Sequence, residues 1–268
     1  MEITFIIVNY RQQGLVKQCI KGIEQSAIRL SYEIIVVDND SQDGTPEMLK
    51  KDFPNVRVIQ SPKNGGFGYG CNLGFRNARG EYFITINPDV AFVSSAAEKM
   101  HDFFVFHTSA GIVGPKLIHP DGSIQYSCRR FPNLLIPLYR RTAIGKIPFA
   151  KKALEKYLMA DVSHEKTTRV DWIFGAFLMI KRSHLEKVGY FDERFFLYYE
   201  DLDLCRRFWE KGFEIWYFPE VEFVHYHQRL SANKSGLLAI TNKATRIHIA
   251  SAIKYFAKYF GVKIPRLS

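Results

Sequence analysis

Short apolar segments that alternate with helical patterns in the first third of the chain constrain its fold more than any other feature. Four such segments, at residues 3–8, 33–38, 56–60 and 82–86, are predicted to be β-strands. Strands separated by helices are typical of a parallel sheet, and the unbroken apolar runs at 5–8 and 34–37 indicate strands buried on both faces. The sequence therefore predicts an α/β fold with a central, mostly parallel sheet flanked by helices.

Polar side chains follow three of these predicted strands. Asn9 and Asp38 come at the ends of the first two, and Asp89 follows the fourth. The carboxyl ends of parallel strands lie along one edge of the sheet, where ligands of open α/β folds bind. Asp-Asn-Asp clusters also close turns, so we favour ligand binding for Asp38 and turn formation for Asp40 and Asp43.

Acidic residues follow an aromatic run between positions 189 and 207, a combination typical of sugar-binding sites. Apolar residues three, four and seven positions after Asp201 predict a helix that begins near Glu200. The acids could serve only to complement the helix dipole, and this segment alone leaves that alternative open. The strand-end Asp89 and two late histidines favour a single converging site.

A glycine-rich segment, residues 64–70, precedes a helix predicted from about 71 to 79. Glycines before a helix allow the backbone to approach a phosphate or a sugar closely, and the helix N-terminus favours negative charge. The spacing is neither that of a Rossmann fingerprint nor that of a Walker loop, and a flexible turn is the alternative.

Taken in order, these motifs resemble those of the inverting nucleotide-sugar glycosyltransferases of family 2, which have a single-domain GT-A fold. Within that family the chain is similar to bacterial rhamnosyltransferases of cell-surface polysaccharide assembly. The matching segments are residues 6–10, 36–45, 64–68, 87–89, 171–176, 191–205 and 225–231. Each is weak alone, but their common order over most of the chain makes chance similarity improbable.

The resemblance implies a divalent metal, Mg²⁺ or Mn²⁺, held by Asp89 and a late histidine. Asn87-Pro88-Asp89 replaces the family's Asp-x-Asp motif, so only Asp89 brings a full carboxylate charge. One carboxylate can suffice when substrate phosphates supply the other ligands. His225 matches the histidine position better than His227, and either could instead be a packed or surface residue.

Catalysis in an inverting enzyme needs a carboxylate within hydrogen-bond reach of the acceptor hydroxyl, and Asp201 is our candidate general base, with Glu200 as the alternative. By resemblance Asp38 contacts the nucleoside base, and Arg229 and Ser231 handle the diphosphate. The residues expected to bind the donor are Asn9, Tyr10, Arg11, Asp38, Asn64, Gly65, Gly66, Phe67, Asn72, Asn87, Trp172, Gly175, Arg229 and Ser231.

The expected substrates are a nucleoside-diphosphate sugar, preferably dTDP-rhamnose, and a lipid-diphosphate-linked saccharide acceptor. Another donor, such as a UDP-hexose, is the enzymatic alternative. A non-catalytic carbohydrate-binding protein is the alternative from a different class.

Charge and cysteine usage bound the partners and the compartment. The formal net charge is +10, yet every charged residue after Glu222 is basic, so the basicity is concentrated in the tail. This distribution favours an anionic membrane surface or a diphosphate over a nucleic acid. The four cysteines are scattered without a Cys-x-x-Cys pair, which argues against a disulfide scaffold and a zinc site. We expect a cytoplasmic protein that is peripheral at the inner face of the cell membrane.

We expect one catalytic domain over residues 1–235, with a nucleotide-sugar-binding half at 1–118 and an acceptor-side half at 119–235. The second half begins with a hairpin turn at Asp121-Gly122 and carries a variable, partly helical insert at 129–169. Residues 236–268 are predicted to form a basic amphipathic helix. Its apolar stripe, which either enters a membrane interface or packs on the core, comprises Ile249, Ile253, Phe256 and Phe260.

Overall fold

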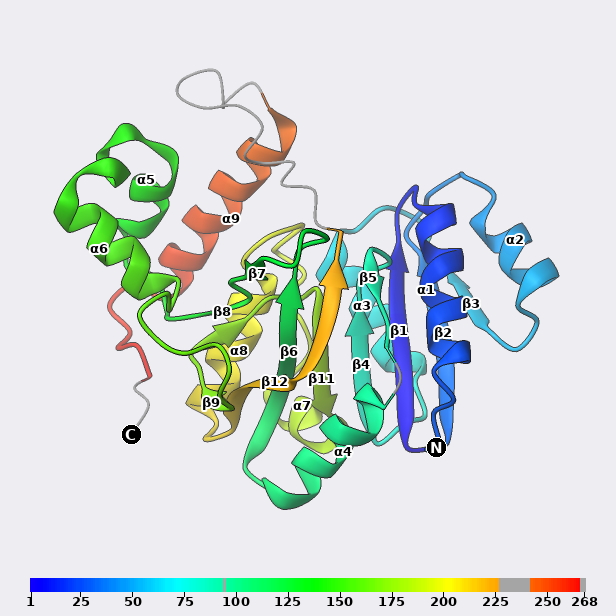
Figure 1. Ribbon diagram of the computed structural model, residues 1–268. Helices are drawn as coiled ribbons and strands as arrows, with labels where there is room; N and C mark the ends of the chain where they lie inside the picture. The colour runs from blue at the N-terminus through cyan, green and yellow to red at the C-terminus, as the bar shows by residue number, and fades with distance from the viewer. Residues whose placement is uncertain (94, 227–241, 266–268) are drawn as a thin grey trace.

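The computed structural model describes residues 1–93, 95–226 and 242–265, and it has three layers, with a central sheet between two sets of helices (Figure 1). The strands are β1 (Ile3–Asn9), β2 (Tyr32–Asp38), β3 (Arg57–Gln60), β4 (Tyr82–Ile86), β5 (Val90–Ala91), β6 (Ala110–Ile118), β7 (Ile124–Gln125), β8 (Cys128–Arg129), β9 (Thr168–Arg169), β10 (Trp172–Ile173), β11 (Phe177–Lys181) and β12 (Glu214–His225). The helices are α1 (Gln13–Gln25), α2 (Thr45–Asp52), α3 (Phe67–Asn77), α4 (Ala96–Phe106), α5 (Ile136–Arg141), the 3₁₀ helix η1 (Ala143–Lys146), α6 (Pro148–Tyr157), α7 (Arg182–Val188), α8 (Glu200–Glu210) and α9 (Lys243–Lys258).

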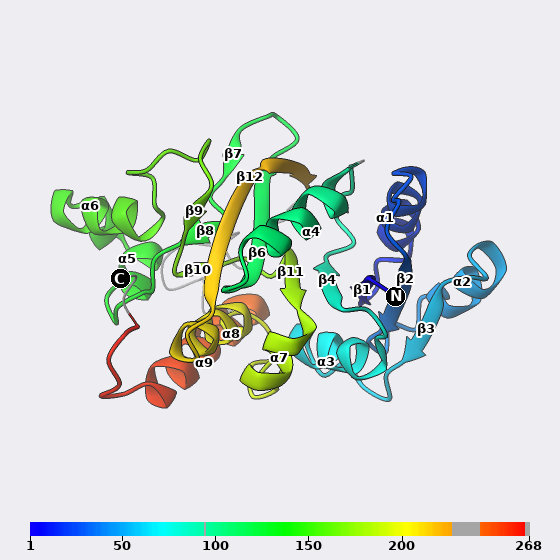
Figure 2. The same ribbon diagram turned by 90° about the horizontal axis from the view of Figure 1, so that it is seen from below.

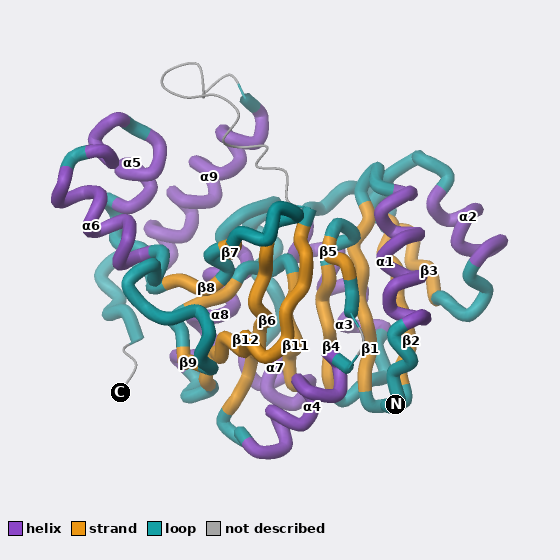
Figure 3. Tube along the Cα trace, viewed as in Figure 1, coloured by secondary structure: helices purple, strands orange, loops and turns teal. Residues whose placement is uncertain are grey.

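The strands of the main sheet run in the order β3-β2-β1-β4-β11-β6-β12-β5. Neighbours from β3 to β4 are parallel, β11 is antiparallel to β4 and β6, and β12 is parallel to β6. β1, β2, β4, β6 and β12 therefore end at the same edge of the sheet, the upper edge in Figure 3. The predicted α/β architecture with four N-terminal strands is confirmed.

Each face of the sheet buries its own apolar cluster. Phe5 on β1 packs in the cluster that contains α1 and α4, whereas the adjacent Ile6 packs in the cluster that contains α3, α7 and α8. Figure 2 shows α1 and α4 on one face of the sheet and α3, α7 and α8 on the other. Alternation of side chains along a strand explains why an unbroken apolar run serves both layers.

The start of helix α3 differs from the prediction, whereas the hairpin turn and the helical insert agree with it. Helix α3 begins at Phe67, four residues before the predicted start, because the glycines at 68 and 70 are buried within its first turns. The predicted hairpin turn is present, with Gly122 at a φ of 80° and Ser123 N–H donating to Asp121 Oδ1 over 2.9 Å. The insert is partly helical as predicted, since α5, η1 and α6 lie within it.

Helix α9 packs on the catalytic domain through a face other than the predicted stripe. Its buried residues are Thr245, Ser251, Ala252 and Tyr255. Three members of the predicted stripe, Ile249, Ile253 and Phe260, are exposed, with 65% of Ile253 and 85% of Phe260 open to solvent. The segment 236–241 of the predicted helix lies outside the described residues.

Lys254 and Lys258 of α9 bind the rest of the protein and do not project freely from it. Lys258 Nζ forms ion pairs with Asp192 and with the fully buried Asp203, and Lys254 Nζ donates to the carbonyl oxygen of Arg194 over 2.7 Å. Both side chains help to fix α9 on α8 and on the segment before it. Among the helices of the described ranges, none is long and apolar enough to cross a membrane.

Candidate active site

The ends of β1 and β2 are joined by a network centred on Asn9. Its Nδ2 lies 3.0 Å from Asp38 Oδ1, 2.9 Å from Ser41 Oγ and 3.0 Å from Thr45 Oγ1. Asn9 has no exposed surface, so the expected direct contact with the donor does not fit this geometry. Asn9 instead orients Asp38 and ties the strand ends to the start of α2.

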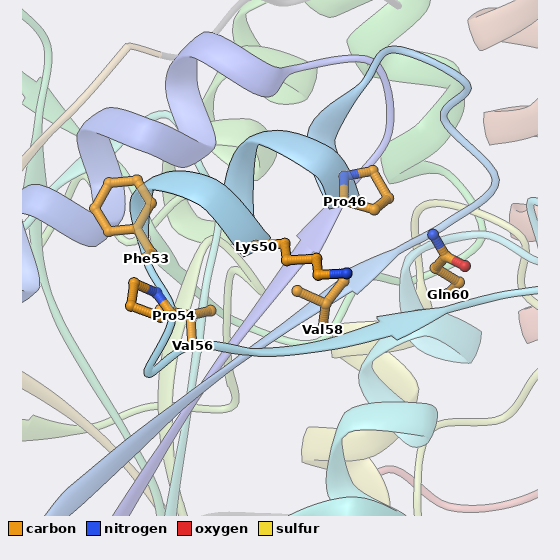
Figure 4. Close-up of a pocket in the computed structure, with 7 residues that line it drawn as sticks. All are labelled: Pro46, Lys50, Phe53, Pro54, Val56, Val58 and Gln60. Carbon is orange, nitrogen blue, oxygen red and sulfur yellow. The ribbon is translucent and has the colours of Figure 1, made fainter.

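A pocket of about 470 Å³ opens beside Asp38 at the ends of β2 and β3, and its lining includes Asp38, Asp40, Gln42, Gly44, Pro46, Glu47, Gln60 and Ser61. Carboxylate and amide groups in such a pocket can accept and donate hydrogen bonds to the edge of a nucleoside base. The neighbouring hollow between α2 and β3 shares Pro46 and Gln60 but is otherwise mainly apolar (Figure 4). With no carboxylate or histidine in its lining, that second hollow has no evident chemistry.

The glycine-rich loop is fixed between β2 and the aromatic run. Asn39 Nδ2 donates to Asn64 Oδ1 over 3.1 Å and to the carbonyl oxygen of Gly66 over 3.0 Å. Gly66 has a φ of 91°, and a Cβ there would lie 1.9 Å from the carbonyl oxygen of Phe196. Only glycine fits this position, and the loop is thereby held against the segment that leads into α8.

Asn72, expected to bind the donor, has a structural role instead. Its Nδ2 donates to the carbonyl oxygen of Phe191 and to Glu193 Oε1, both over 2.9 Å, while its Oδ1 accepts from Phe191 N–H. The side chain is buried with its hydrogen-bonding capacity used. It links α3 to the start of the aromatic run.

Asp201 is held at the start of α8 by two backbone donors. Gly175 N–H donates to Oδ2 over 2.9 Å, and Leu202 N–H donates to Oδ1 over 2.8 Å. Burial raises the pKa of Asp201, while the two N–H groups and the nearby Arg129 act in the opposite direction. A fixed, partly exposed carboxylate with a raised pKa is suited to accept a proton.

Glu200 occupies a different environment although it is adjacent in sequence. It is buried, its Oε2 has no hydrogen-bond partner among the described residues, and its charge contributes to a raised pKa at Cys71 on α3. Burial raises the pKa of Glu200 well above its usual range, and the charge of Asp201 raises it further. Both effects favour the neutral form of Glu200, which makes Asp201 the better candidate for the base.

Backbone strain is concentrated near the site. Tyr198 and Tyr199, immediately before Glu200, have φ values of 68° and 70°. Arg11 and Asp40, in the loops after β1 and β2, also have positive φ values. Non-glycine residues rarely adopt this conformation, and they do so mainly where surrounding structure holds a functional segment in place.

Asp89 and His225 come together because β5 pairs with the end of β12, with Val90 opposite His225. His225 Nε2 lies 3.2 Å from Asp89 Oδ1, and His225 Nδ1 lies 2.7 Å from Gln125 Oε1. A proton on Nδ1 that is donated to Gln125 leaves the Nε2 lone pair beside the carboxylate, an arrangement suited to metal binding. These two side chains fit one divalent cation.

Substrate phosphates can supply further metal ligands. Within the described ranges no group of three His, Cys, Asp or Glu side chains could hold a metal ion. A hard cation such as Mg²⁺ or Mn²⁺ is commonly held by one or two protein ligands together with phosphate oxygens. Affinity for the metal should therefore depend on bound nucleotide.

Backbone contacts connect the Asp89–His225 pair to the candidate base. Asn87 N–H donates to the carbonyl oxygen of Ala176 over 2.8 Å, and Ala176 follows the glycine that holds Asp201. A Cβ on Gly175 would lie 3.1 Å from the ring of Phe67 at the start of α3. The glycine-rich loop, the Asn87–Asp89 turn and the start of α8 thus meet around residues 174–176.

Of the other residues expected to bind the donor, Tyr10 and Trp172 lie within the described ranges and Arg229 and Ser231 do not. Tyr10 is exposed after β1, and the Arg11 guanidinium lies 5.3 Å from the centre of its ring. Trp172 is buried, with its indole N–H donating to the carbonyl oxygen of Arg130 over 3.0 Å. His227, Arg229 and Ser231 lie outside the described residues.

Three residues at the site were not identified from sequence. Asn39 lies within a motif that was recognised, but its role depends on the glycine loop folding back onto it. Gln125 and Arg129 give no sequence signal, because Gln125 is 100 positions from its partner His225 and Arg129 lies at the start of the variable insert.

Comparison with protein families and curated relatives agrees with this geometry. The family model described as glycosyl transferase family 2 matches residues 4–189. The N-acetylglucosaminyl-diphospho-decaprenol L-rhamnosyltransferase of Mycobacterium tuberculosis is 32% identical over 230 residues, which cover 81% of this chain and 74% of the relative. Rhamnosyltransferase WbbL of Escherichia coli K12 is 26% identical over 94% of this chain and 92% of its own length.

Solved structures share the fold at low sequence identity. The mannosyltransferase PcManGT from Pyrobaculum calidifontis, in complex with GDP-Man and Mn²⁺, has a TM-score of 0.56 and 16% identity, covering 98% of this chain and 76% of its own. GalNAc-T7, solved with UDP, GalNAc and Mn²⁺, has a TM-score of 0.63 and 13% identity, covering 85% of this chain but only 44% of its own. Staphylococcus aureus TarS 1–349 with UDP has a TM-score of 0.54 and 16% identity, covering 84% of this chain and 60% of its own. The chain belongs to the family 2 glycosyltransferases and has the GT-A fold.

Proposed function

We propose that this enzyme is an inverting glycosyltransferase that moves rhamnose from dTDP-rhamnose to a lipid-diphosphate-linked saccharide in cell-surface polysaccharide synthesis. The observation that carries the proposal is the fixed, partly exposed carboxylate of Asp201, which meets the glycine-rich loop and the Asn87–Asp89 turn around residues 174–176. The choice of sugar and acceptor is supported by the two rhamnosyltransferases to which the chain is similar.

The transfer follows from the position of Asp201. Its carboxylate accepts the proton of the acceptor hydroxyl as that oxygen forms a bond to the anomeric carbon. The bond between the anomeric carbon and the diphosphate oxygen breaks on the opposite face, so the nucleoside diphosphate leaves and the configuration inverts. No covalent enzyme intermediate is needed. Glu200, buried and with a raised pKa, supports the start of α8 without taking part in proton transfer.

We propose that Asp89 and His225 hold Mg²⁺ or Mn²⁺, which when bound neutralises the charge that develops on the leaving diphosphate. Gln125 orients the imidazole so that Nε2 faces Asp89. The hydrogen bond from Asn87 N–H to the carbonyl oxygen of Ala176 fixes residues 87–89, and this sets the position of Asp89 relative to Gly175 and Asp201.

The direct test is transfer by purified enzyme to a short-chain lipid diphosphate N-acetylglucosamine, with dTDP-rhamnose, UDP-glucose and UDP-galactose compared in the presence of Mn²⁺ or a chelator. The proposal requires dTDP-rhamnose to give the highest kcat/KM, a product of inverted anomeric configuration, and loss of turnover with chelator. Preference for a UDP-hexose would replace the donor assignment and leave the base unchanged. Donor binding without transfer or hydrolysis under any condition would favour a non-catalytic carbohydrate-binding protein.

We also propose that the enzyme associates peripherally with the inner face of the cell membrane. Support comes from apolar side chains that stay exposed on the insert and on the tail, among them Leu134, Phe149, Ile253 and Phe260. They accompany the basic residues of α5 and α6, and such a combination suits an anionic lipid surface. Figure 1 shows α5, α6 and α9 together at the end of the molecule opposite β3.

The membrane proposal is tested by co-sedimentation with anionic and neutral vesicles. Phe149→Glu with Ile253→Glu should reduce binding to anionic vesicles, because both side chains are more than half exposed. Substitution of Lys258 is a poor test, because that lysine forms ion pairs with buried Asp203. Equal sedimentation of wild type and variant would contradict the proposal.

A further inference from the structure

Arg129 is a buried cation that sequence analysis did not single out. It lies on β8 opposite Trp172 of β10, and its guanidinium carbon is 4.2 Å from the centre of the Phe174 ring. Its Nη1 donates to Tyr157 Oη over 3.3 Å, and its buried Nε has no hydrogen-bond partner in the described part of the chain. Aromatic faces stabilise the charge, but part of its hydrogen-bonding capacity is left unused.

Two further arginines, Arg140 and Arg141, are less buried than Arg129. The guanidinium carbon of Arg140 lies 5.9 Å from the centre of the Tyr157 ring, which Arg129 contacts at 5.4 Å. Arg141 is half-buried and Arg140 is exposed, so the three side chains form a series from interior to solvent. None of the three forms an ion pair with a carboxylate of the described residues.

Burial and the neighbouring arginines lower the pKa values of Arg129 and of His248. Burial lowers the pKa of Arg129 to about 10, and the charge of Arg140 contributes to the lowering. Burial also lowers the pKa of His248 on α9 to about 3, and Arg141, Arg140 and Arg129 lower it further. His248 is therefore neutral near pH 7, and it packs on Tyr198 with ring centres 4.8 Å apart. Arg129 and Arg140 share the Tyr157 ring and form no carboxylate ion pair among the described residues, which favours binding of an anion.

The arginine cluster (Arg129, Arg140 and Arg141) lies on the insert side of the candidate base. The Arg129 guanidinium packs on the ring of Phe174. Phe174 immediately precedes Gly175, whose N–H donates to Asp201. Asp201 is near enough to raise the pKa of Arg129. An anion held by the cluster is thus close to the carboxylate that receives the acceptor proton, and distinct from the Asp89–His225 pair assigned to the donor diphosphate.

We propose that the arginine cluster binds the diphosphate of the lipid-linked acceptor and thereby holds its saccharide beside Asp201. The inference rests on the function proposed above and adds a binding site to it. Arginine suits this role because its planar fork binds phosphate oxygens through two hydrogen bonds. The exposed apolar residues Leu134, Leu138 and Phe149 on the same insert would then lie along the lipid chain.

The test measures binding of farnesyl diphosphate to the full chain by calorimetry, with saturating dTDP and Mn²⁺ present to occupy the donor site. The perturbing variant is Arg140→Gln with Arg141→Gln, which leaves buried Arg129 in place. The matched control is Lys151→Gln with Lys152→Gln, two exposed lysines on α6 of the same insert. Farnesol serves as the probe without diphosphate, and phosphatidylglycerol vesicles represent a lipid headgroup.

The proposal predicts that the arginine variant binds farnesyl diphosphate at least about tenfold more weakly, since two charge-assisted contacts are lost. The lysine control and the affinity for dTDP should stay within about twofold of wild type, because solvent screens exposed charges. The proposal is overturned if both double variants weaken farnesyl diphosphate equally, or if farnesol binding falls as much as diphosphate binding. It is also overturned if dTDP affinity falls in parallel, which would assign the cluster to the donor.

Vesicle binding and transfer separate the remaining sources of failure. A loss of vesicle binding in the arginine variant with unchanged farnesyl diphosphate affinity would make the cluster a headgroup site and overturn the proposal. Arginine-dependent binding of farnesyl diphosphate by an enzyme that transfers no sugar to any lipid diphosphate would refute the proposed function and leave the anion site standing. With active enzyme, the arginine variant should raise the KM for acceptor at least about tenfold and leave the KM for donor unchanged.

Discussion

Asp201→Asn should abolish transfer while preserving donor binding, and the paired substitution Glu200→Gln should preserve both. The amide of asparagine cannot accept the acceptor proton, so kcat should fall by about 100-fold to 10,000-fold, the usual contribution of general base catalysis. Donor affinity should change little, because Asp201 contacts backbone N–H groups at residues 175 and 202 and not the nucleotide pocket.

The structure also sets the cost of Asp201→Asn in stability. Both carboxylate oxygens accept from backbone N–H groups, over 2.9 Å and 2.8 Å. An asparagine can accept with only one oxygen, so its NH₂ group must face the other N–H donor. One unsatisfied donor costs about 1 to 3 kcal/mol, which corresponds to a fall in Tm of about 2 to 10 °C. The variant should still fold, and its loss of turnover can be attributed to chemistry.

Glu200→Gln provides the matched comparison. A protonated glutamic acid and a glutamine have nearly the same shape and charge, and the buried environment of Glu200 favours the neutral form. Turnover by this variant should remain close to wild type. The assay is initial-rate transfer together with dTDP binding by calorimetry for all three proteins. An inactive Glu200→Gln beside an active Asp201→Asn would refute the base assignment and move it by one residue.

The pH dependence of stability gives an independent check on Glu200. Because its pKa in the folded protein is raised, its contribution to stability is fully present below the unfolded pKa of about 4.3 and is lost as the pH rises through the folded value. Glutamine does not titrate, so the Tm of Glu200→Gln relative to wild type should increase as the pH rises above the unfolded pKa of Glu200. A Tm difference that does not change with pH would contradict a raised pKa at Glu200.

Three further predictions concern the metal pair, the glycine loop and the C-terminal helix. His225→Ala should remove Mn²⁺-dependent strengthening of dTDP binding, which calorimetry with and without Mn²⁺ measures; an unchanged Mn²⁺ effect would exclude this residue as a ligand. Gly66→Ala should lower the Tm by at least about 4 °C and reduce turnover, because the added Cβ would lie 1.9 Å from a carbonyl oxygen at a φ of 91°; a wild-type Tm would show that the loop adapts. Lys258→Met should cost about 1 to 3 kcal/mol in urea unfolding, because buried Asp203 loses an ion pair, whereas Lys254→Met should cost less, since Lys254 donates only to a backbone carbonyl at the surface; equal costs would contradict this assignment.

The sequence predicted the strands and the family but misjudged several polar side chains. Strand positions followed from apolar runs, since a strand buried on both faces must be apolar throughout. Asn9 and Asn72 were expected to contact the donor because each lies in or beside a recognised motif. Both are buried and use their hydrogen bonds within the protein. A motif marks where a site lies, but it does not distinguish a residue that binds the ligand from one that holds its neighbour.

The tail illustrates the same limit for an amphipathic helix. Periodicity identified one apolar stripe on α9, and the structure buries a different face that contains Thr245, Ser251 and Tyr255. A hydrophobic stripe predicts that a helix is amphipathic, but which surface it meets depends on the partner. Here Lys258 and Tyr259 both donate hydrogen bonds to Asp203 on α8, and the apolar stripe is left largely exposed.

The sequence by itself determined the α/β architecture, the family, and the residue types from which the site is built. Only the tertiary structure decided that burial raises the pKa of Glu200, that Gln125 orients His225, and that Arg129 lies near the candidate base. The physical reason is that strand and helix formation depends on periodicity over neighbouring residues. Burial, pKa and hydrogen-bond partners depend instead on segments that can be 100 or more positions apart in the chain and meet only when the sheet is assembled.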